Sequence, residues 1–205
     1  MPEFYQDLIT QKSFEALQNL KREFDFILIG GWAVFLYTKA LKSKDIDLIV
    51  QYEALGQLRK KYSLTKNERL KKYEIKQEEI DVDIYLPHYS QLGLPVEDIR
   101  TYAVEREGFK VPKIEALLIL KQFVFLQRRG TTKGEKDRLD ILSLLKAEEI
   151  NWNFYQELLE KYHLKEFKKE LTGLLKETRQ APELGLNEYK MAKLRKKISA
   201  VLRQK

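Results

Sequence analysis

The sequence predicts an α+β protein whose first half mixes strands and helices and whose second half is helical. Short apolar runs bounded by turn residues alternate with helical periods over residues 1–112. From residue 113 onward, apolar side chains follow a helical period almost throughout. A glycine pair after the first apolar run marks a turn from strand to helix. We therefore expect an α/β core over 1–112 and a helical C-terminal region over 113–205.

Each element of the first half has its own signal. Residues 5–22 carry apolar side chains close to a helical period, so we expect a helix there. The elements expected next are a strand at 26–29, a helix at 32–40, a strand at 45–50, a helix at 52–62, strands at 70–76 and 79–86 joined by a polar turn, and a hairpin of 100–106 with 108–111. Pro87 ends the second of the paired strands, because proline cannot donate to a sheet. In the helical half we expect breaks near 130–134, Asn151 and 181–185.

Composition limits the kind of protein this can be. The 205 residues suffice for one core, or for a core with a small appended domain. No apolar run approaches the roughly 18–20 residues that a membrane-spanning helix needs. Residues 1–7 are acidic and lack the basic and apolar regions of a signal peptide. We therefore expect a cytoplasmic protein that has no membrane partner.

The supply of metal-binding side chains is also restricted. The chain has no cysteine and two histidines. Disulfides and thiolate metal sites are excluded, and a histidine-based site has little to draw on. A bound metal would be held mainly by oxygen atoms, which favours Mg²⁺ or Mn²⁺.

The most informative motif is Gly30-Gly31 followed by Asp45-Ile46-Asp47. Glycines at the start of a helix let the backbone approach a phosphate group. Residues two apart on a strand have side chains on one face, so Asp45 and Asp47 can bind the divalent cation that accompanies a nucleotide. The motif therefore indicates phosphoryl or nucleotidyl transfer.

A second acidic strand strengthens this interpretation. Along 79–86, Asp81 and Asp83 face one way while the apolar residues between them face the other. If this strand neighbours the strand at 45–50, three or four carboxylates converge. Like charges so close repel one another, and one or two Mg²⁺ ions would stabilise them.

Together these residues resemble the DNA polymerase β-type nucleotidyltransferase superfamily, whose pattern is a glycine pair, an Asp-X-Asp strand and a third Asp on a neighbouring strand. The chain is most similar to its minimal prokaryotic members, including the abortive-infection and toxin–antitoxin group. The resemblance implies a mixed β-sheet flanked by helices and two metal ions. It also implies an enzyme that transfers an NMP group from an NTP such as ATP to a hydroxyl, with release of pyrophosphate.

The resemblance also assigns roles to residues. The catalytic and metal-binding set is Asp45, Asp47 and Asp83, with Asp81 as the alternative third carboxylate, and the nucleotide-binding set is Gly30, Gly31, Ser43 and Lys121. Many members have serine at the position of Gly31, a departure that concerns the subfamily more than the activity. The resemblance extends into residues 113–147, which we expect to complete the active site.

Lys121 is unusual because it interrupts a helix that is apolar on nearly every side. A buried lysine needs an anionic partner. Lys121 reaches the nucleotide phosphates, extends outward to solvent, or forms an ion pair with Asp140 that holds two helices together. Asp140 is accordingly either this partner or a further site residue. Asp137 is interpreted as stabilising the first turn of its helix.

The acceptor of the transferred group is left open by the sequence. An RNA or tRNA end, a protein hydroxyl or a small molecule would all use the same donor site. Residues 186–205 contain seven Lys or Arg against one Glu, so they are either an RNA contact or a solvated amphipathic helix. A different class of function is a nucleotide-binding antitoxin or regulatory protein with little or no turnover.

Overall fold

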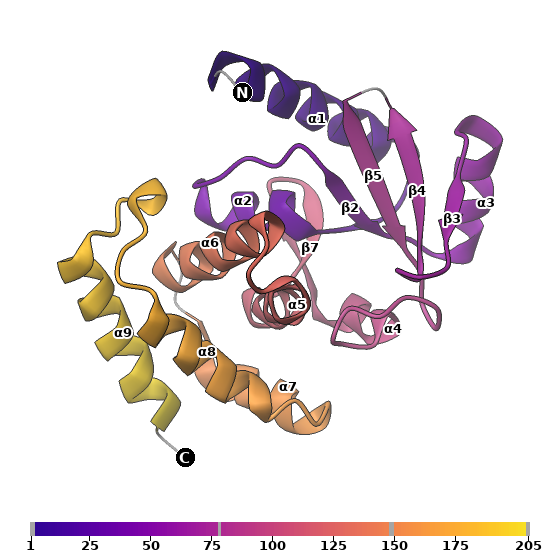
Figure 1. Ribbon diagram of the computed structural model, residues 1–205. Helices are drawn as coiled ribbons and strands as arrows, with labels where there is room; N and C mark the ends of the chain where they lie inside the picture. The colour runs from indigo at the N-terminus through magenta and orange to yellow at the C-terminus, as the bar shows by residue number, and fades with distance from the viewer. Residues whose placement is uncertain (1–2, 78, 148–149, 204–205) are drawn as a thin grey trace. The chain divides into compact units, whose positions relative to one another are not determined.

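The computed structural model describes residues 3–77, 79–147 and 150–203. It divides the chain into two compact units, residues 1–113 and 114–205 (Figure 1). The first unit contains a five-stranded sheet, and the second is helical. The α+β fold class expected from the sequence is confirmed.

The central sheet of the first unit is mixed. Its strands are β1 (Ile27–Ile29), β2 (Ile46–Ile49), β3 (Thr65–Asn67), β4 (Lys72–Gln77) and β5 (Ile80–Tyr85). They are arranged in the order β1-β2-β5-β4-β3. The β2 and β5 strands are parallel and all other neighbours are antiparallel. The two acidic strands are therefore neighbours.

Helices and a second hairpin surround this sheet. They are α1 (Glu3–Glu23), α2 (Gly30–Thr38), α3 (Tyr52–Lys61), α4 (Val96–Ile99), the 3-10 turn η1 (Arg100–Tyr102), and the hairpin of β6 (Ala103–Arg106) with β7 (Phe109–Pro112). Figure 1 shows α1 beside β5, and α2 packs on β1 and β2. The sequence did not predict β3, which contains no apolar residue, or α4, whose four residues are too short to show a helical period.

One face of the sheet forms the core. Leu28, Leu48 and Ile84 are register partners on β1, β2 and β5, and all three are buried. Trp32 on α2 is also buried, and its indole Nε1–H donates to Ser13 Oγ of α1 at 2.9 Å. The opposite face of the sheet, which carries Asp47 and Asp83, is left for polar groups.

The second unit consists of α5 (Ile114–Arg128), α6 (Thr132–Ala147), α7 (Trp152–Lys161), α8 (Glu166–Glu177), the 3-10 turn η2 (Pro182–Leu184) and α9 (Glu188–Arg203). Helix α5 packs against α6, α7 and α8. The breaks predicted near 130–134, Asn151 and 181–185 are present. A further break over 162–165 was not predicted, because no glycine or proline marks it; His163 there adopts a left-handed φ of 57°. Among the described residues, no helix is long and apolar enough to cross a membrane.

Candidate active site

The turn from β1 into α2 brings Asp47 against Gly30. Gly30 has a φ of +66°, which L-residues rarely adopt, and it begins the helix two residues earlier than the sequence predicted. A Cβ atom at this position would lie only 2.0 Å from Asp47 Oδ2. The Asp47 carboxylate thus occupies the space that the side chain of any residue other than glycine would fill at position 30. The position requires glycine for two independent reasons.

The first turn of α2 is suited to an anion. It contains no acidic residue, and Ile29 at its N-cap provides no side-chain hydrogen bond. Backbone N–H groups and the helix dipole at such an end favour negative charge. Gly31, in this first turn, is buried. This geometry is compatible with the phosphate-binding role that the resemblance assigns to the glycine pair.

Three carboxylates lie in a row across the polar face of the sheet. Asp47 on β2 is the register partner of Asp83 on β5, which in turn is the partner of Glu74 on β4. Directly paired residues of neighbouring strands have side chains on the same face, close together. Asp81 shares this face, but it is exposed, and its register partner on β4 is Lys76. The register thus brings Asp83, rather than Asp81, beside Asp47.

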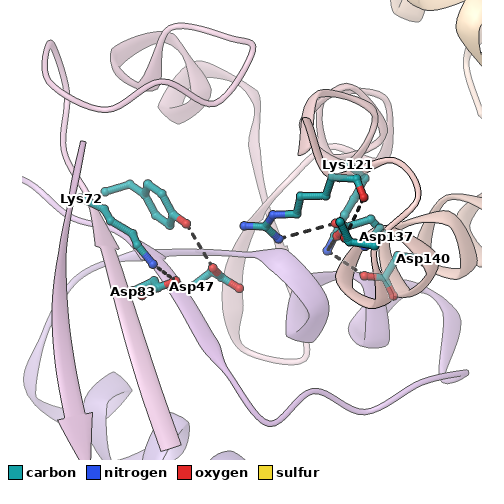
Figure 2. Close-up of polar contacts among 10 residues, drawn as sticks. Asp47, Lys72, Asp83, Lys121, Asp137 and Asp140 are labelled. Carbon is teal, nitrogen blue, oxygen red and sulfur yellow. Dashed lines mark hydrogen bonds and ion pairs between the residues drawn. The ribbon is translucent and has the colours of Figure 1, made fainter. Parts of the chain in front are cut away.

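Lys72 lies between two of these carboxylates. Its Nζ is 2.6 Å from Asp83 Oδ2, as Figure 2 shows. The same Nζ is 3.0 Å from Glu74 Oε1. Asn67 Nδ2 also donates to Glu74 Oε1 at 2.9 Å. On the other side of Asp83, the Tyr85 hydroxyl donates to Asp47 Oδ1 at 3.4 Å. Sequence reasoning missed this network, because its members are distinguished only once the β4–β5 register is known.

The pKa values reflect this crowding. Burial, and secondarily the Asp47 charge, raise the pKa of Asp83 to about 6, although Lys72 opposes the shift. For Lys72, burial is the largest influence and lowers the pKa, but the ion pairs with Asp83 and Glu74 outweigh it and raise the pKa overall. For Glu74, burial acts upward but is outweighed by Asn67 and Lys72, so that the pKa is lowered. Of Asp83 and Glu74, Asp83 is therefore the one whose pKa is shifted toward neutrality.

The residues of this face fit a hard divalent cation. Within the described ranges, no group of three or more acidic or histidine side chains is close enough to enclose a metal ion. Mg²⁺, however, is commonly held by one or two carboxylates together with water and substrate phosphates. Asp47 and Asp83 are adjacent oxygen donors of this kind. Asp45 is half-buried just before β2 and Ser43 is buried, and their assigned roles stay predictions.

In the second unit, Lys121 forms the ion pair that was one of its predicted alternatives. Its Nζ lies 2.7 Å from Asp140 Oδ2 and 3.5 Å from Asp137 Oδ1 (Figure 2). The three side chains are 8%, 1% and 6% exposed. A contact of Lys121 with nucleotide is still a prediction. Asp140 Oδ1 accepts no hydrogen bond from the described residues, although it is buried.

The interpretation of Asp137 as a first-turn residue was wrong. Helix α6 begins at Thr132, so Asp137 lies beyond its first turn, and its side chain is buried. It is bound instead by charged partners, since Arg128 Nη1 is 3.5 Å from Asp137 Oδ2 and Lys121 is on its other oxygen. Burial raises the pKa of Asp137, and the two cations oppose this shift. The residue serves a buried ion-pair network between α5 and α6.

The basic C-terminal segment forms the amphipathic helix α9. Met191, Ile198 and Leu202 are buried, whereas its exposed side chains include those of Lys190, Lys193, Lys196, Lys197 and Arg203. Lys205, which was part of the predicted basic segment, lies outside the described residues. The geometry agrees with an amphipathic helix, and its use as an RNA contact stays a prediction.

Comparison with known proteins identifies the fold. No model of a known protein family matches the chain, and no curated protein sequence matches it. A candidate nucleotidyltransferase from H. pylori is similar in structure, with a TM-score of 0.57 and 16% identity over 100% of this chain and 97% of that one. JHP933 from Helicobacter pylori has a TM-score of 0.56 and 16% identity, and the match covers 100% of this chain and 94% of that one. ANT(2'')-Ia in complex with adenylyl-2''-tobramycin has a TM-score of 0.51 and 13% identity, and the match covers 78% of this chain and 98% of that one. The chain has the nucleotidyltransferase fold.

Proposed function

We propose that this protein is a metal-dependent nucleotidyltransferase that transfers an NMP group from an NTP to a hydroxyl group of an acceptor. The observation that carries the proposal is the position of Asp47. Its carboxylate lies against Gly30 at the start of α2 and beside Asp83 on the neighbouring strand. A phosphate-binding helix end and a pair of oxygen ligands therefore adjoin one another within this fold.

The first unit supplies the donor half of this site. Backbone N–H groups at Gly30 and Gly31 would bind the triphosphate, with Ser43 as a further contact. Asp47 and Asp83, with Asp45 as the third predicted ligand, would hold Mg²⁺ or Mn²⁺. When bound, such an ion neutralises phosphate charge and acts as a Lewis acid. Lys121 and Asp140 of the second unit are further candidates for the complete enzyme.

In the proposed reaction, the acceptor hydroxyl oxygen forms a bond to the α-phosphorus of the NTP. The bond from the α-phosphorus to the oxygen bridging it to the β-phosphorus breaks, and pyrophosphate leaves with that electron pair. The hydroxyl proton passes to a base. We assign this role to Asp83, whose carboxylate lies beside Asp47 on the neighbouring strand.

The acceptor belongs to one of three classes: an RNA or tRNA end, a protein hydroxyl or a small molecule. The structure of ANT(2'')-Ia contains adenylyl-2''-tobramycin, a nucleotidylated small molecule. The basic exposed face of α9 favours a polyanionic acceptor such as RNA. Labelling of a mixed pool of acceptors is therefore the appropriate first experiment.

The test is incubation with each α-³²P-labelled NTP, Mg²⁺ or Mn²⁺, and a cell extract that contains all three acceptor classes. We expect one class of molecule to become labelled, and labelling to fall about 10²–10³-fold in Asp47→Asn and Asp83→Asn. Asp81→Asn tests the alternative third carboxylate. Glu53→Gln, an exposed acid on α3, is the control and should label normally.

The outcomes separate the two classes of function. NTP binding by the wild-type protein without any labelled product favours the nucleotide-binding antitoxin or regulatory protein. Absence of both NTP binding and product rules out the proposal. Equal labelling by the wild type and Asp47→Asn would refute the assignment of the site while leaving the activity in place.

A further inference from the structure

We propose that Lys72 is an internal counter-ion of the metal site, which pairs with Asp83 before a divalent cation binds and with Glu74 afterwards. This inference rests on the proposed function, because it concerns the same pair of carboxylates. Its consequence is that Lys72 competes with the cation and so sets the concentration at which the site fills. Lys72 would be a positioning residue and not a catalytic one.

The first observation is where the ammonium group lies. Lys72 is on β4, outside the glycine and Asp-X-Asp motifs, yet its Nζ is 2.6 Å from Asp83 Oδ2. Its side chain is 10% exposed and that of Asp83 is 18% exposed. A positive charge of the protein thus binds an oxygen atom that the proposed function assigns to a divalent cation. The Lys72 ammonium group and a divalent cation cannot both bind Asp83 Oδ2 closely, because their positive charges repel each other.

The second observation is that Lys72 has another partner in place. Glu74 Oε1 lies 3.0 Å from the same Nζ, and Asn67 holds that oxygen with a hydrogen bond of 2.9 Å. If Asp83 were its only partner, displacement would leave a buried ammonium without a carboxylate, which is unfavourable. With Glu74 fixed by Asn67, Lys72 moves away from Asp83 and stays paired. The network therefore permits exchange.

The third observation is the charge of the row. Asp47, Asp83 and Glu74 are consecutive register partners, so three carboxylates adjoin one another on one face. Without a cation their repulsion disfavours the ionised form of each. Lys72 reduces this repulsion while the cation is absent and withdraws when a stronger cation arrives.

The experiment measures Mn²⁺ binding to the full chain without nucleotide, by the electron paramagnetic resonance signal of free Mn²⁺. The variant is Lys72→Met and the matched control is Lys76→Met. Lys76 lies on the same strand and face, about 13 Å along β4. Removal of the competing charge should lower the Kd for Mn²⁺ at least about tenfold in Lys72→Met, whereas Lys76→Met should stay within about twofold of the wild type.

A second measurement is thermal unfolding with and without Mn²⁺. Lys72→Met should unfold at a lower temperature than the wild type in the absence of metal, and saturating Mn²⁺ should raise its Tm by more. If Lys72→Met does not fold without metal, Lys72→Gln removes the charge, keeps a hydrogen-bond donor and should show the same tightening of Mn²⁺ binding.

The outcomes distinguish this inference from the proposed function. Wild-type protein that binds Mn²⁺, together with an unchanged or weaker Kd in Lys72→Met and Lys72→Gln, overturns the role of Lys72 and leaves the metal site intact. Wild-type protein and both variants that bind no Mn²⁺, either alone or with NTP added, overturn the metal site itself. An equal tightening in Lys76→Met would show that general charge, and not the contact with Asp83, is responsible.

Discussion

Substitution of Gly30 by alanine tests how closely Asp47 is held against the start of α2. Gly30 has a φ of +66°, and an L-residue in this region costs about 1–2 kcal/mol. Gly108 has a φ of +77° in the same unit, and its added Cβ would meet only the flexible end of the Lys21 side chain. Gly108→Ala therefore carries a similar backbone cost without a carboxylate in contact.

The additional cost at Gly30 comes from Asp47. The new Cβ would lie 2.0 Å from Asp47 Oδ2, 2.6 Å from Cγ and 2.8 Å from Cβ. Rotation of the Asp47 side chain relieves the first two contacts but not the third, because Cβ is fixed by the backbone of β2. Part of α2 or β2 must then move, an overpacking cost of about 1–3 kcal/mol. Gly30→Ala should lose about 2–5 kcal/mol in total.

Urea unfolding of the wild type and both variants measures these losses, and Mn²⁺ and NTP titrations measure the site. We expect Gly30→Ala to lose more stability than Gly108→Ala by about 1–3 kcal/mol, and to lose metal and nucleotide binding as well. Gly108→Ala should bind both ligands normally. Equal losses of stability in the two variants, with ligand binding intact in Gly30→Ala, would refute the reasoning, because the contact with Asp47 would then have no consequence.

Three further predictions concern the charged groups. The pKa of Asp83 is raised to about 6, mainly by burial, so Mn²⁺ affinity should fall as the pH drops through 6. Because the folded pKa lies above the unfolded one, protonation of Asp83 should also add stability between pH 7 and pH 4, and urea unfolding should show Asp83→Asn losing this gain. Lys121→Met should lower the free energy of unfolding by about 3–5 kcal/mol, because buried carboxylates lose their cation, and a second change, Asp140→Asn, should restore part of it; an unchanged urea midpoint would contradict this. RNA binding measured by fluorescence anisotropy should weaken steeply with KCl, and glutamine at the exposed lysines of 190–197 should flatten that slope; a slope that does not change excludes α9 as the contact.

The sequence was informative wherever the structure depends on local pattern. Apolar runs located β1, β2 and β5, and the period-two alternation at 79–86 placed Asp81 and Asp83 on one face. The observed order β1-β2-β5 brought the two acidic strands together, as the hypothesis required. What pattern alone left open was the choice between Asp81 and Asp83, because a shift of two residues in the register of β2 with β5 decides which of them lies opposite Asp47.

Long-range pairing accounts for the features that were missed. Lys72 and Asp83 are eleven residues apart and meet only through the antiparallel register of β4 and β5. The ion pair of Lys121 with Asp140 was one of the alternatives considered, but its choice depends on how α5 and α6 pack. Asp137 was misjudged because the start of α6 at Thr132 lies further from it than the sequence suggested. The first two cases depend on a contact between elements, and the third depends on a helix boundary.

Burial distinguishes Lys72 from Lys121, each of which neutralises two carboxylates. Around Lys121 the side chains are 8%, 6% and 1% exposed, so a cation that replaced its ammonium group would have to shed nearly all of its water. Around Lys72 they are 10%, 16% and 18% exposed, and Mg²⁺ there would retain water ligands, as it prefers to do. Lys72 also has a second carboxylate fixed by Asn67. An exchange of cations is therefore favoured at Lys72, where water and an alternative partner are both available, and a permanent ion pair is favoured at Lys121.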